Sequence, residues 1–299
     1  IIYHLNFFYN EFQILPGGFF GVDVFFVISG YLITSIILQE LKITNDFSFK
    51  NFYERRARRI LPVLILVILT SIPFALLILM PGSLVNFSKS IIYSLVFSSN
   101  FFFHFSGQIY GAESGLLKPF LHTWSLSVEE QFYIIFPLII FFLFKRFNKN
   151  IFSFLIVTFF LSLLIAIWGS KNYPSFYFYV LFSRGWEVLA GSLLAYFEQT
   201  LGRRCKKKKI NFIFPSIGLI LILHSFLFFD DTMQHPSFIT ISPIIGVCLI
   251  IWFSNQNEII TKILSSKIFV GVGLISYSLY LWHYPIFAFS RITGVIEAD

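Results

Sequence analysis

Runs of about 20 apolar residues recur along almost the whole chain, and no other feature limits its fold as strongly. Such a run is long enough to cross the roughly 30 Å hydrocarbon core of a bilayer as a helix. Of the 299 residues, 57% are hydrophobic and 12% are charged, whereas a soluble domain has roughly 45–50% apolar and about 25% charged residues. We therefore predict an all-α, polytopic transmembrane helical bundle that forms one domain over residues 1–299. The expected spans are 1–9, 18–41, 60–80, 129–145, 151–169, 181–198, 210–229, 236–254 and 268–289, about nine in all.

The stretch 84–104 is apolar but is interrupted by polar residues, and the distribution of basic residues decides whether it crosses. If it does not cross, 17 of the 22 lysines and arginines fall on one side of the membrane. If it crosses, the two sides carry about equal numbers, which the positive-inside rule disfavours. We therefore predict that 81–128 is an outer excursion with a re-entrant or interfacial helix. The basic loops, including the run 206–209, are then cytoplasmic.

Composition also narrows the function classes. The net charge of +7 is first a topology signal in a membrane protein, and nucleic-acid binding is not expected. The two cysteines, Cys205 and Cys248, do not suggest a structural disulfide. Phosphate loops, dinucleotide glycine patterns and zinc-ligand spacings do not occur, so no metal site is predicted. The chain begins at Ile1 without an initiator methionine, and we expect a fragment of a longer protein whose first span is truncated.

His4 and Asp23 form the first candidate site. The turn at Pro16-Gly17-Gly18 places both residues roughly 10 Å from the outer surface, at matching depth on neighbouring segments. A carboxylate facing lipid is costly, so Asp23 should face inward and pair. An imidazole oriented by a carboxylate can act as a general base. A purely structural His–Asp pair explains the same residues equally well.

A cluster of arginines comes directly before the third expected span. Arg55, Arg56, Arg58 and Arg59 form two i,i+3 pairs on adjacent columns of a helix. Guanidinium groups bind phosphate with two parallel hydrogen bonds, so the cluster suits a polyanionic phosphate. The alternative, an anchor that only orients the protein, remains open.

The motif His122-Thr-Trp-Ser-Leu-Ser-Val-Glu-Glu-Gln-Phe-Tyr133 puts several polar side chains directly before an apolar run. Ionisable groups at the mouth of a membrane helix tend to mark a pathway or a site. The serines and glutamates can instead cap the helix, but capping explains neither His122 nor Trp124. Candidate residues here are His122, Trp124, Ser127, Glu129 and Glu130, and we expect them at the outer face.

Two further motifs follow at the outer ends of later spans. Arg184 and Glu187 stand three residues apart on a helix, so we expect them to neutralise one another. The tryptophan and tyrosine of Trp282-His-Tyr-Pro285 fit an aromatic belt, which leaves His283 as the unusual residue.

Together these motifs resemble the acyltransferase-3 family of integral membrane O-acyltransferases. The resemblance rests on Tyr3-His4-Leu5, Pro16 to Ile33, Phe52 to Pro62, His122 to Tyr133, Arg184 to Gly191 and Ser276 to Pro285. It implies ten spans, the last of them beyond this chain. By motif, His4 matches the essential first-span histidine of the family, and Asp23 matches the aspartate of its glycine- and phenylalanine-rich motif. Arg56 and Arg59 match its Arg-x-x-Arg pair, which is implicated in donor binding.

The resemblance also implies a function, in the bacterial cytoplasmic (inner) membrane. The family transfers an acyl group, usually acetyl, from cytoplasmic acyl-CoA to O-antigen, other surface polysaccharides or peptidoglycan. Acetyl-CoA would be a co-substrate, and no tightly bound cofactor is expected. Partners would be the lipid bilayer, acyl-CoA and the glycan acceptor, and the parent protein can carry a C-terminal SGNH-type domain. A proton-coupled transporter or a flippase for lipid-linked glycans is the alternative, because intramembrane His, Asp and Glu also serve proton relays.

Overall fold

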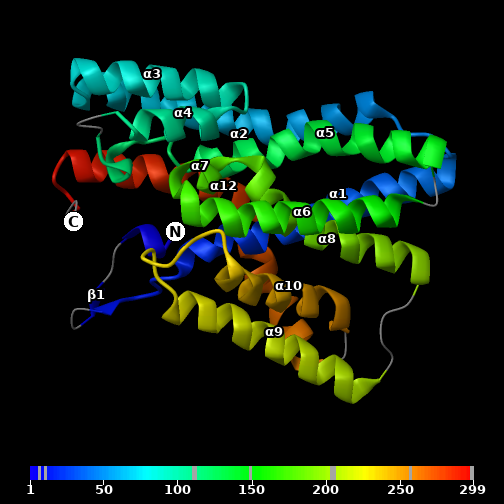
Figure 1. The fold of residues 1–299 in the computed structure, drawn as a ribbon. Helices are drawn as coiled ribbons and strands as arrows, with labels where there is room; N and C mark the ends of the chain where they lie inside the picture. The colour runs from blue at the N-terminus through cyan, green and yellow to red at the C-terminus, as the bar shows by residue number, and fades with distance from the viewer. Residues whose placement is uncertain are drawn as a thin grey trace.

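A computed structural model describes residues 1–5, 8–9, 12–109, 113–147, 150–202, 207–255 and 258–296 of the chain (Figure 1). The helices are α1 Gly21–Thr44, α2 Phe49–Ile78, α3 Pro81–Leu95, α4 Ser99–Gly107, α5 Thr123–Phe147, α6 Ile151–Asn172, α7 Pro174–Tyr179, α8 Leu181–Leu201, α9 Lys208–Phe228, α10 Ile241–Phe253, α11 Ile259–Leu264 and α12 Lys267–Ile292. Short 3-10 helices are η1 Tyr3–Leu5, η2 Gly18–Phe20, η3 Gly115–Leu117 and η5 Phe238–Thr240. Two two-residue strands, β1 Phe8–Tyr9 and β2 Phe12–Gln13, pair antiparallel with Phe8 opposite Gln13.

The predicted all-α membrane bundle is confirmed. Within the described residues, five helices are long and apolar enough to cross a bilayer, and they cover 18–44, 49–78, 123–146, 151–172 and 209–228. Helices α8 and α12 are of comparable length, and α10 is shorter. The prediction of a span over 1–9 was wrong, because this segment forms η1 and strand β1 instead of a membrane helix. A segment this short has too few intrahelical hydrogen bonds to offset the free-energy cost of helix nucleation by itself.

Helix α2 begins eleven residues before the predicted span at 60, so the arginine cluster lies inside the helix. The side chain of Ser48 accepts a hydrogen bond from the backbone N–H of Asn51, which caps the helix start. Hydropathy detects only the apolar part of a helix and therefore misses this polar first section. The helix continues through Pro62 and Pro73.

The predicted non-crossing excursion is a pair of helices. Helix α3 ends at Leu95, and α4 begins at Ser99 and returns beside it (Figure 1). Phe97 in the turn has a φ of 51°, the left-handed region that allows a sharp reversal. The side-chain amide of Gln131 in α5 holds this turn by donating to the Phe97 carbonyl and to Asn100 Oδ1, both at 2.9 Å. The stretch 84–104 therefore does not cross as a single helix.

Glycines bring α1 and α8 into close contact. A Cβ added to Gly30 would lie 1.9 Å from the carbonyl oxygen of Val188, and one added to Gly191 would lie 1.9 Å from that of Val27. Only glycine fits such a close approach of two backbones. The contact matters for the site because it brings Asp23 of α1 next to the first turn of α8.

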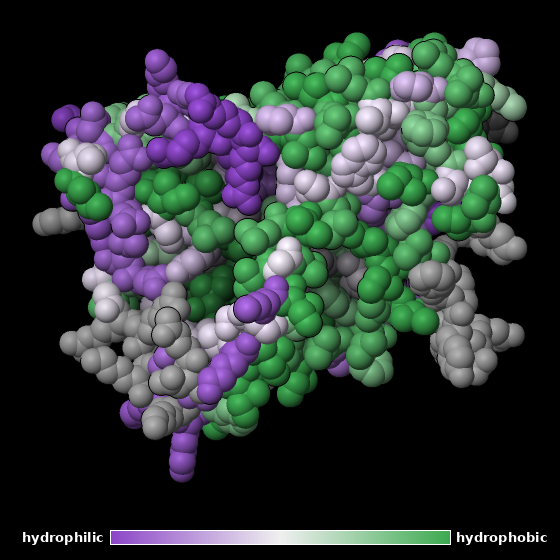
Figure 2. Space-filling model, turned by 180° about the vertical axis from the view of Figure 1, so that it is seen from behind, coloured by the Kyte–Doolittle hydropathy of each residue, from purple (hydrophilic) through white to green (hydrophobic). Residues whose placement is uncertain are grey.

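The bundle has one markedly hydrophilic end. Three pairs of consecutive helices meet at this end (Figure 1): α1 ends and α2 begins there, α5 ends and α6 begins, and α8 ends and α9 begins. In the opposite view, hydrophilic residues gather at this end while apolar residues cover most of the remaining face (Figure 2). The side chains of Lys42, Arg55, Arg58 and Lys145 belong to this end, whereas residues 203–206 of the predicted basic loop lie outside the described part. The two ends therefore differ in charge as the sequence predicts.

Candidate functional site

Three polar clusters lie inside the bundle, and the start of α5 contacts all of them. His122 belongs to a cluster of histidines, Trp124 lies against Arg184, and Glu129 and Glu130 bind Arg56. All of these α5 residues are less than 10% exposed. The sequence-predicted motif is thus a buried part of the site, and α5 begins at Thr123, so its serines lie within the helix and do not cap its start.

Asp23 lies in the first cluster, which is an ion-pair network between α1 and α8. Arg184 Nη1 donates to Asp23 Oδ1 at 2.8 Å and to Glu187 Oε1 at 3.1 Å, and all three side chains are at most 1% exposed. The predicted contact of Arg184 with Glu187 is confirmed. The predicted pairing of Asp23 with His4 was wrong, since Asp23 binds Arg184. A guanidinium is always charged and offers several donors, so it is the stronger partner for a buried carboxylate.

His235 completes this network and was missed in the sequence. It lies in the segment between α9 and α10, where Nε2 accepts a hydrogen bond from Arg184 Nη1 at 2.7 Å. Burial, and then the positive charge of Arg184, lower the pKa of His235 well below its ordinary value. The ring is therefore neutral, with its proton on Nδ1, which donates to Thr240 Oγ1 at 3.1 Å. A single histidine before a proline carries no local signal of such a role.

The second cluster contains His4, His122 and His283, from three different parts of the chain. The ring of His283 lies 5.4 Å from that of His4 and 5.5 Å from that of His122, measured between centroids. The ring of Tyr284 packs against His4 and His122, with ring centroids 5.0 Å and 5.4 Å apart, respectively. The predicted residues His4, His122 and His283 are thus brought together, although the sequence did not group them.

The histidines of this cluster have free ring nitrogens. Among the described residues, neither nitrogen of His122 has a hydrogen-bond partner, and the same holds for Nε2 of His283. His283 Nδ1 lies 2.6 Å from the Tyr280 carbonyl, so Nδ1 carries the proton and Nε2 is left as an acceptor. Unpaired buried polar atoms are rare and need an explanation, which a substrate can supply.

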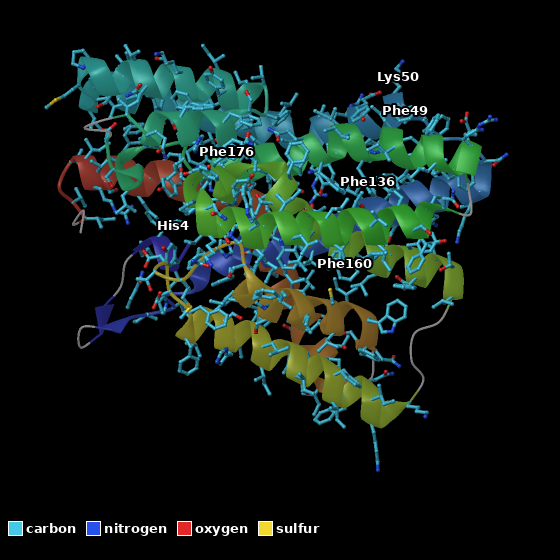
Figure 3. The ribbon with its side chains drawn as sticks, in the orientation of Figure 1. His4, Phe49, Lys50, Phe136, Phe160 and Phe176 are labelled. Carbon is cyan, nitrogen blue, oxygen red and sulfur yellow. The ribbon has the colours of Figure 1, made fainter. Side chains whose placement is uncertain are left out.

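Close packing places His4 in the cluster. Gly18 leaves room for Tyr3, because an added Cβ would lie 2.7 Å from the Tyr3 Cβ. Arg291 at the end of α12 donates a hydrogen bond to the backbone carbonyl of His4. Figure 3 shows His4 near the end of the bundle opposite to Lys50.

Arg56 lies in the third cluster and is not free at the surface. It donates to Glu130 Oε1 through Nε at 2.8 Å and Nη2 at 2.6 Å, and to Glu129 Oε1 at 3.0 Å. Its guanidinium also stacks 3.8 Å from the ring centroid of Tyr133. The hydroxyls of Ser29 and Tyr133 both contact Glu129. Neither Ser29 nor Tyr133 was singled out in the sequence, and only the tertiary contacts reveal them.

The arginine cluster therefore divides into one partly buried member, Arg56, and three exposed members. Arg55, Arg58 and Arg59 are exposed at the hydrophilic end, with Arg58 paired to Glu54 at 2.6 Å on the surface. The prediction that Glu129 and Glu130 lie at the outer face, away from the arginines, was wrong. Glu130 lies eight residues along from His122, which is about 12 Å of helix, and α2 rises about 10 Å from its start to Arg56. The two helices meet inside the bundle.

One contact of α12 links the arginine-bearing helix to the helix that carries His283. The Tyr277 hydroxyl donates to the carbonyl of Ile60, the residue after Arg59, at 3.1 Å. His283 follows six residues later on the same helix, which is about 9 Å at the helical rise. Helix α12 therefore connects the inner end of the arginine stretch of α2 to the histidine cluster.

The remaining predicted residues have structural contacts. Ser127 Oγ lies 2.8 Å from Ser99 Oγ and accepts from the Ser99 backbone N–H at 3.2 Å, which ties α5 to α4. Trp124 packs against Phe178, with ring centroids 4.7 Å apart, and against Arg184. In the part of the chain that the structure describes, no group of three His, Cys, Asp or Glu side chains is placed to hold a metal ion.

Comparison with known proteins agrees with these motifs. Residues 1–296 match the family model described as "Acyltransferase domain". The peptidoglycan O-acetyltransferase OatA of Listeria monocytogenes is 34% identical over 99% of this chain, and the O-acetyltransferase OatA of Staphylococcus aureus is 34% identical over 97%. The chain spans about half the length of these relatives, 48% in both cases. No solved structure matches it. The chain belongs to the acyltransferase-3 family of membrane acyltransferases.

Proposed function

We propose that the protein is a membrane O-acetyltransferase that transfers an acetyl group from acetyl-CoA to a hydroxyl group of an extracytoplasmic glycan, with peptidoglycan as the favoured acceptor. The hydrophilic, basic end would face the cytoplasm of a bacterial cell, and the histidine cluster would lie toward the outer face. The observation that carries the proposal is this histidine cluster, with its unpaired ring nitrogens, on a helix that also contacts α2 directly after Arg59.

The exposed arginines are the proposed donor site. Arg55, Arg58 and Arg59 project at the end where acetyl-CoA would arrive, and guanidinium groups suit its phosphates. Arg56 holds α2 against α5 through its carboxylate partners and is a positioning residue in this proposal.

His4 is the proposed general base. It would take the proton of the sugar hydroxyl while the hydroxyl oxygen attacks the thioester carbonyl. The carbon–sulfur bond then breaks, and the leaving CoA thiolate takes up the proton. His283, whose Nε2 is an acceptor, replaces Asp23 as the residue that supports His4, because it is His283 that lies beside His4. In the alternative route, His4 first takes the acetyl group from the thioester, which releases CoA. The sugar hydroxyl then takes the acetyl group from the histidine in a second step.

The test is acetyl transfer by the protein, purified in nanodiscs, from radiolabelled acetyl-CoA to soluble peptidoglycan fragments. His4→Ala should abolish transfer and leave acetyl-CoA binding unchanged. His224→Ala is the matched control, because His224 in α9 contacts only Phe228 and Phe229 among the described aromatic rings. Full transfer by His4→Ala would overturn the assignment of the base. Lack of acetyl-CoA dependence in the wild type would favour the transporter alternative.

A further inference from the structure

One buried arginine beside the histidine cluster has no carboxylate partner. Arg291 lies in the last turn of α12 and is only 4% exposed. Its Nη2 donates to the backbone carbonyl of His4, but within the described residues Nε and Nη1 have no hydrogen-bond partner, and no ion pair joins the guanidinium to a carboxylate. The buried Arg184, by contrast, binds two carboxylates. A buried charge is costly unless it is paired, so Arg291 is suited to bind an anion.

The position of Arg291 on α12 directs its side chain toward the histidine cluster. Helix α12 ends beside η1, away from the hydrophilic end of the bundle (Figure 1). Tyr284 and Arg291 are seven residues apart, which is almost two full turns, so they lie on the same face of the helix. Long side chains on a helix lean toward its N-terminus, so Arg291 reaches back toward Tyr284, whose ring packs against His4 and His122. The hydrogen bond to the His4 carbonyl shows that the guanidinium arrives beside the proposed base.

Unpaired polar atoms gather at this place in the described structure. Five such buried atoms belong to three residues: both ring nitrogens of His122, Nε2 of His283, and Nε and Nη1 of Arg291. Because unpaired buried polar atoms are rare, their concentration around His4 indicates groups arranged for a reacting molecule and not for the fold alone. Of the three residues, only the arginine keeps its positive charge throughout the physiological pH range. Arg291 is therefore the member that can stabilise a negative charge.

The proposed reaction creates a negative charge next to His4. When the sugar hydroxyl attacks the thioester carbonyl carbon, the electron pair of the C=O bond moves onto the carbonyl oxygen, which becomes an oxyanion. The same oxyanion forms if His4 itself attacks the thioester. The residues assigned so far do not donate to this oxygen, because His4 takes the proton and Nε2 of His283 is an acceptor. Donors directed at an oxyanion in a site shielded from water make one of the largest contributions to acyl transfer.

We infer that Arg291 is a further catalytic residue, which stabilises the oxyanion of the tetrahedral intermediate. The oxyanion would accept a hydrogen bond from Nε or Nη1, while Nη2 stays on the His4 carbonyl and fixes the guanidinium. The intermediate collapses when the electron pair returns to the C=O bond and the carbon–sulfur bond breaks, and the CoA thiolate takes the proton from His4. This inference rests on the proposed function, because it adds a residue to the same reaction.

The experiment separates turnover from binding in the nanodisc transfer assay. Arg291→Gln should lower kcat about 100-fold and leave the Kd for acetyl-CoA within about twofold. Arg291→Lys, which keeps the charge but not the planar fork of donors, should show a smaller loss. Methylguanidinium added to Arg291→Ala should restore part of the activity, because it supplies the missing donors. Arg146→Gln changes an exposed arginine in the last turn of α5, and this control should keep full activity.

A trifluoromethyl ketone analogue of acetyl-CoA gives a second readout, because its hydrated carbonyl resembles the tetrahedral intermediate. The wild type should bind this analogue more tightly than acetyl-CoA, and Arg291→Gln should remove the difference.

Two results would overturn the inference. A raised KM for the glycan with an unchanged kcat would assign Arg291 to an anionic group of the acceptor. Activity that falls only in proportion to the amount of folded protein, without rescue by methylguanidinium, would show a purely structural role. If the wild type binds acetyl-CoA but transfers to no glycan, the proposed function fails, whereas binding of the analogue still tests Arg291.

Discussion

The Asp23–Arg184–Glu187 network predicts an unequal response to the loss of its members. Two carboxylates share one guanidinium in a fully buried site. Asp23→Asn leaves one carboxylate, Glu187, with Arg184, so the charges balance and the amide oxygen can still accept from Nη1. Arg184→Gln instead leaves two buried carboxylates facing each other, each with an oxygen that already has no hydrogen-bond partner among the described residues.

The magnitudes follow from the contacts that each change removes. Arg184→Gln removes the hydrogen bonds to Asp23, Glu187 and His235, and that to the Phe178 carbonyl. Removing one partner of a buried ion pair costs about 3–5 kcal/mol, because the remaining charge is uncompensated. Asp23→Asn removes no hydrogen bond and restores charge balance, so we expect a cost of about 1 kcal/mol or less. Combining Asp23→Asn with Arg184→Gln should recover about 1–2 kcal/mol of the loss.

The assay is reversible unfolding in mixed micelles by sodium dodecyl sulfate, followed by circular dichroism, for the wild type, both single variants and the double variant. Glu187→Gln serves as a matched control that should resemble Asp23→Asn. Equal destabilisation by Asp23→Asn and Arg184→Gln would refute the reasoning from charge balance. Strictly additive effects in the double variant would contradict a shared network.

Three further predictions concern other parts of the structure. Gly191→Ala should destabilise the fold by about 1–3 kcal/mol, because its Cβ would meet a backbone carbonyl of α1 at 1.9 Å, while Gly271→Ala, with nothing within 4 Å, should be neutral by the same unfolding measurement. The pKa of His235 is lowered on folding, so unfolding takes up a proton below about pH 6.5. His235 alone should thus contribute a fall of about 1.4 kcal/mol per pH unit below that value, and His235→Gln should reduce the slope of stability against pH by this share in a series of unfolding curves. Arg56→Gln should destabilise the protein by about 3–5 kcal/mol, whereas the exposed Arg58→Gln should cost at most about 0.5 kcal/mol but raise the KM for acetyl-CoA in the transfer assay.

Local sequence signals predicted much of the fold, because membrane helices depend on properties of contiguous segments. The apolar runs located most long helices. The count of basic residues predicted that 84–104 does not cross, and the structure has two short helices joined by a turn there instead of one long helix. The start of α2 could not be found in this way, since a capping serine and seven charged or amide residues between Lys50 and Arg59 precede its apolar part. The segment 1–9 was misassigned because its apolar composition is equally compatible with a 3-10 turn packed on α12.

The candidate site was predictable residue by residue but not as a set of contacts. His4, Asp23, Arg184 and His283 were all named, because unusual polar residues in apolar surroundings stand out. Apart from the contact of Arg184 with Glu187, their partners were not predicted, because α1 pairs with α8 through Gly30 and Gly191, which are far apart in sequence. Depth estimates placed His4 and Asp23 at the same level, but two residues at one depth can face different neighbours around a helix.

The position of α5 has a consequence for protein engineering. Its first turns contact side chains from α1, α2, α8 and α12, so they cannot be exchanged independently of those helices. A chimera that takes residues 122–133 from a distant family member, but keeps the remaining helices of this protein, should misfold even if every motif is preserved.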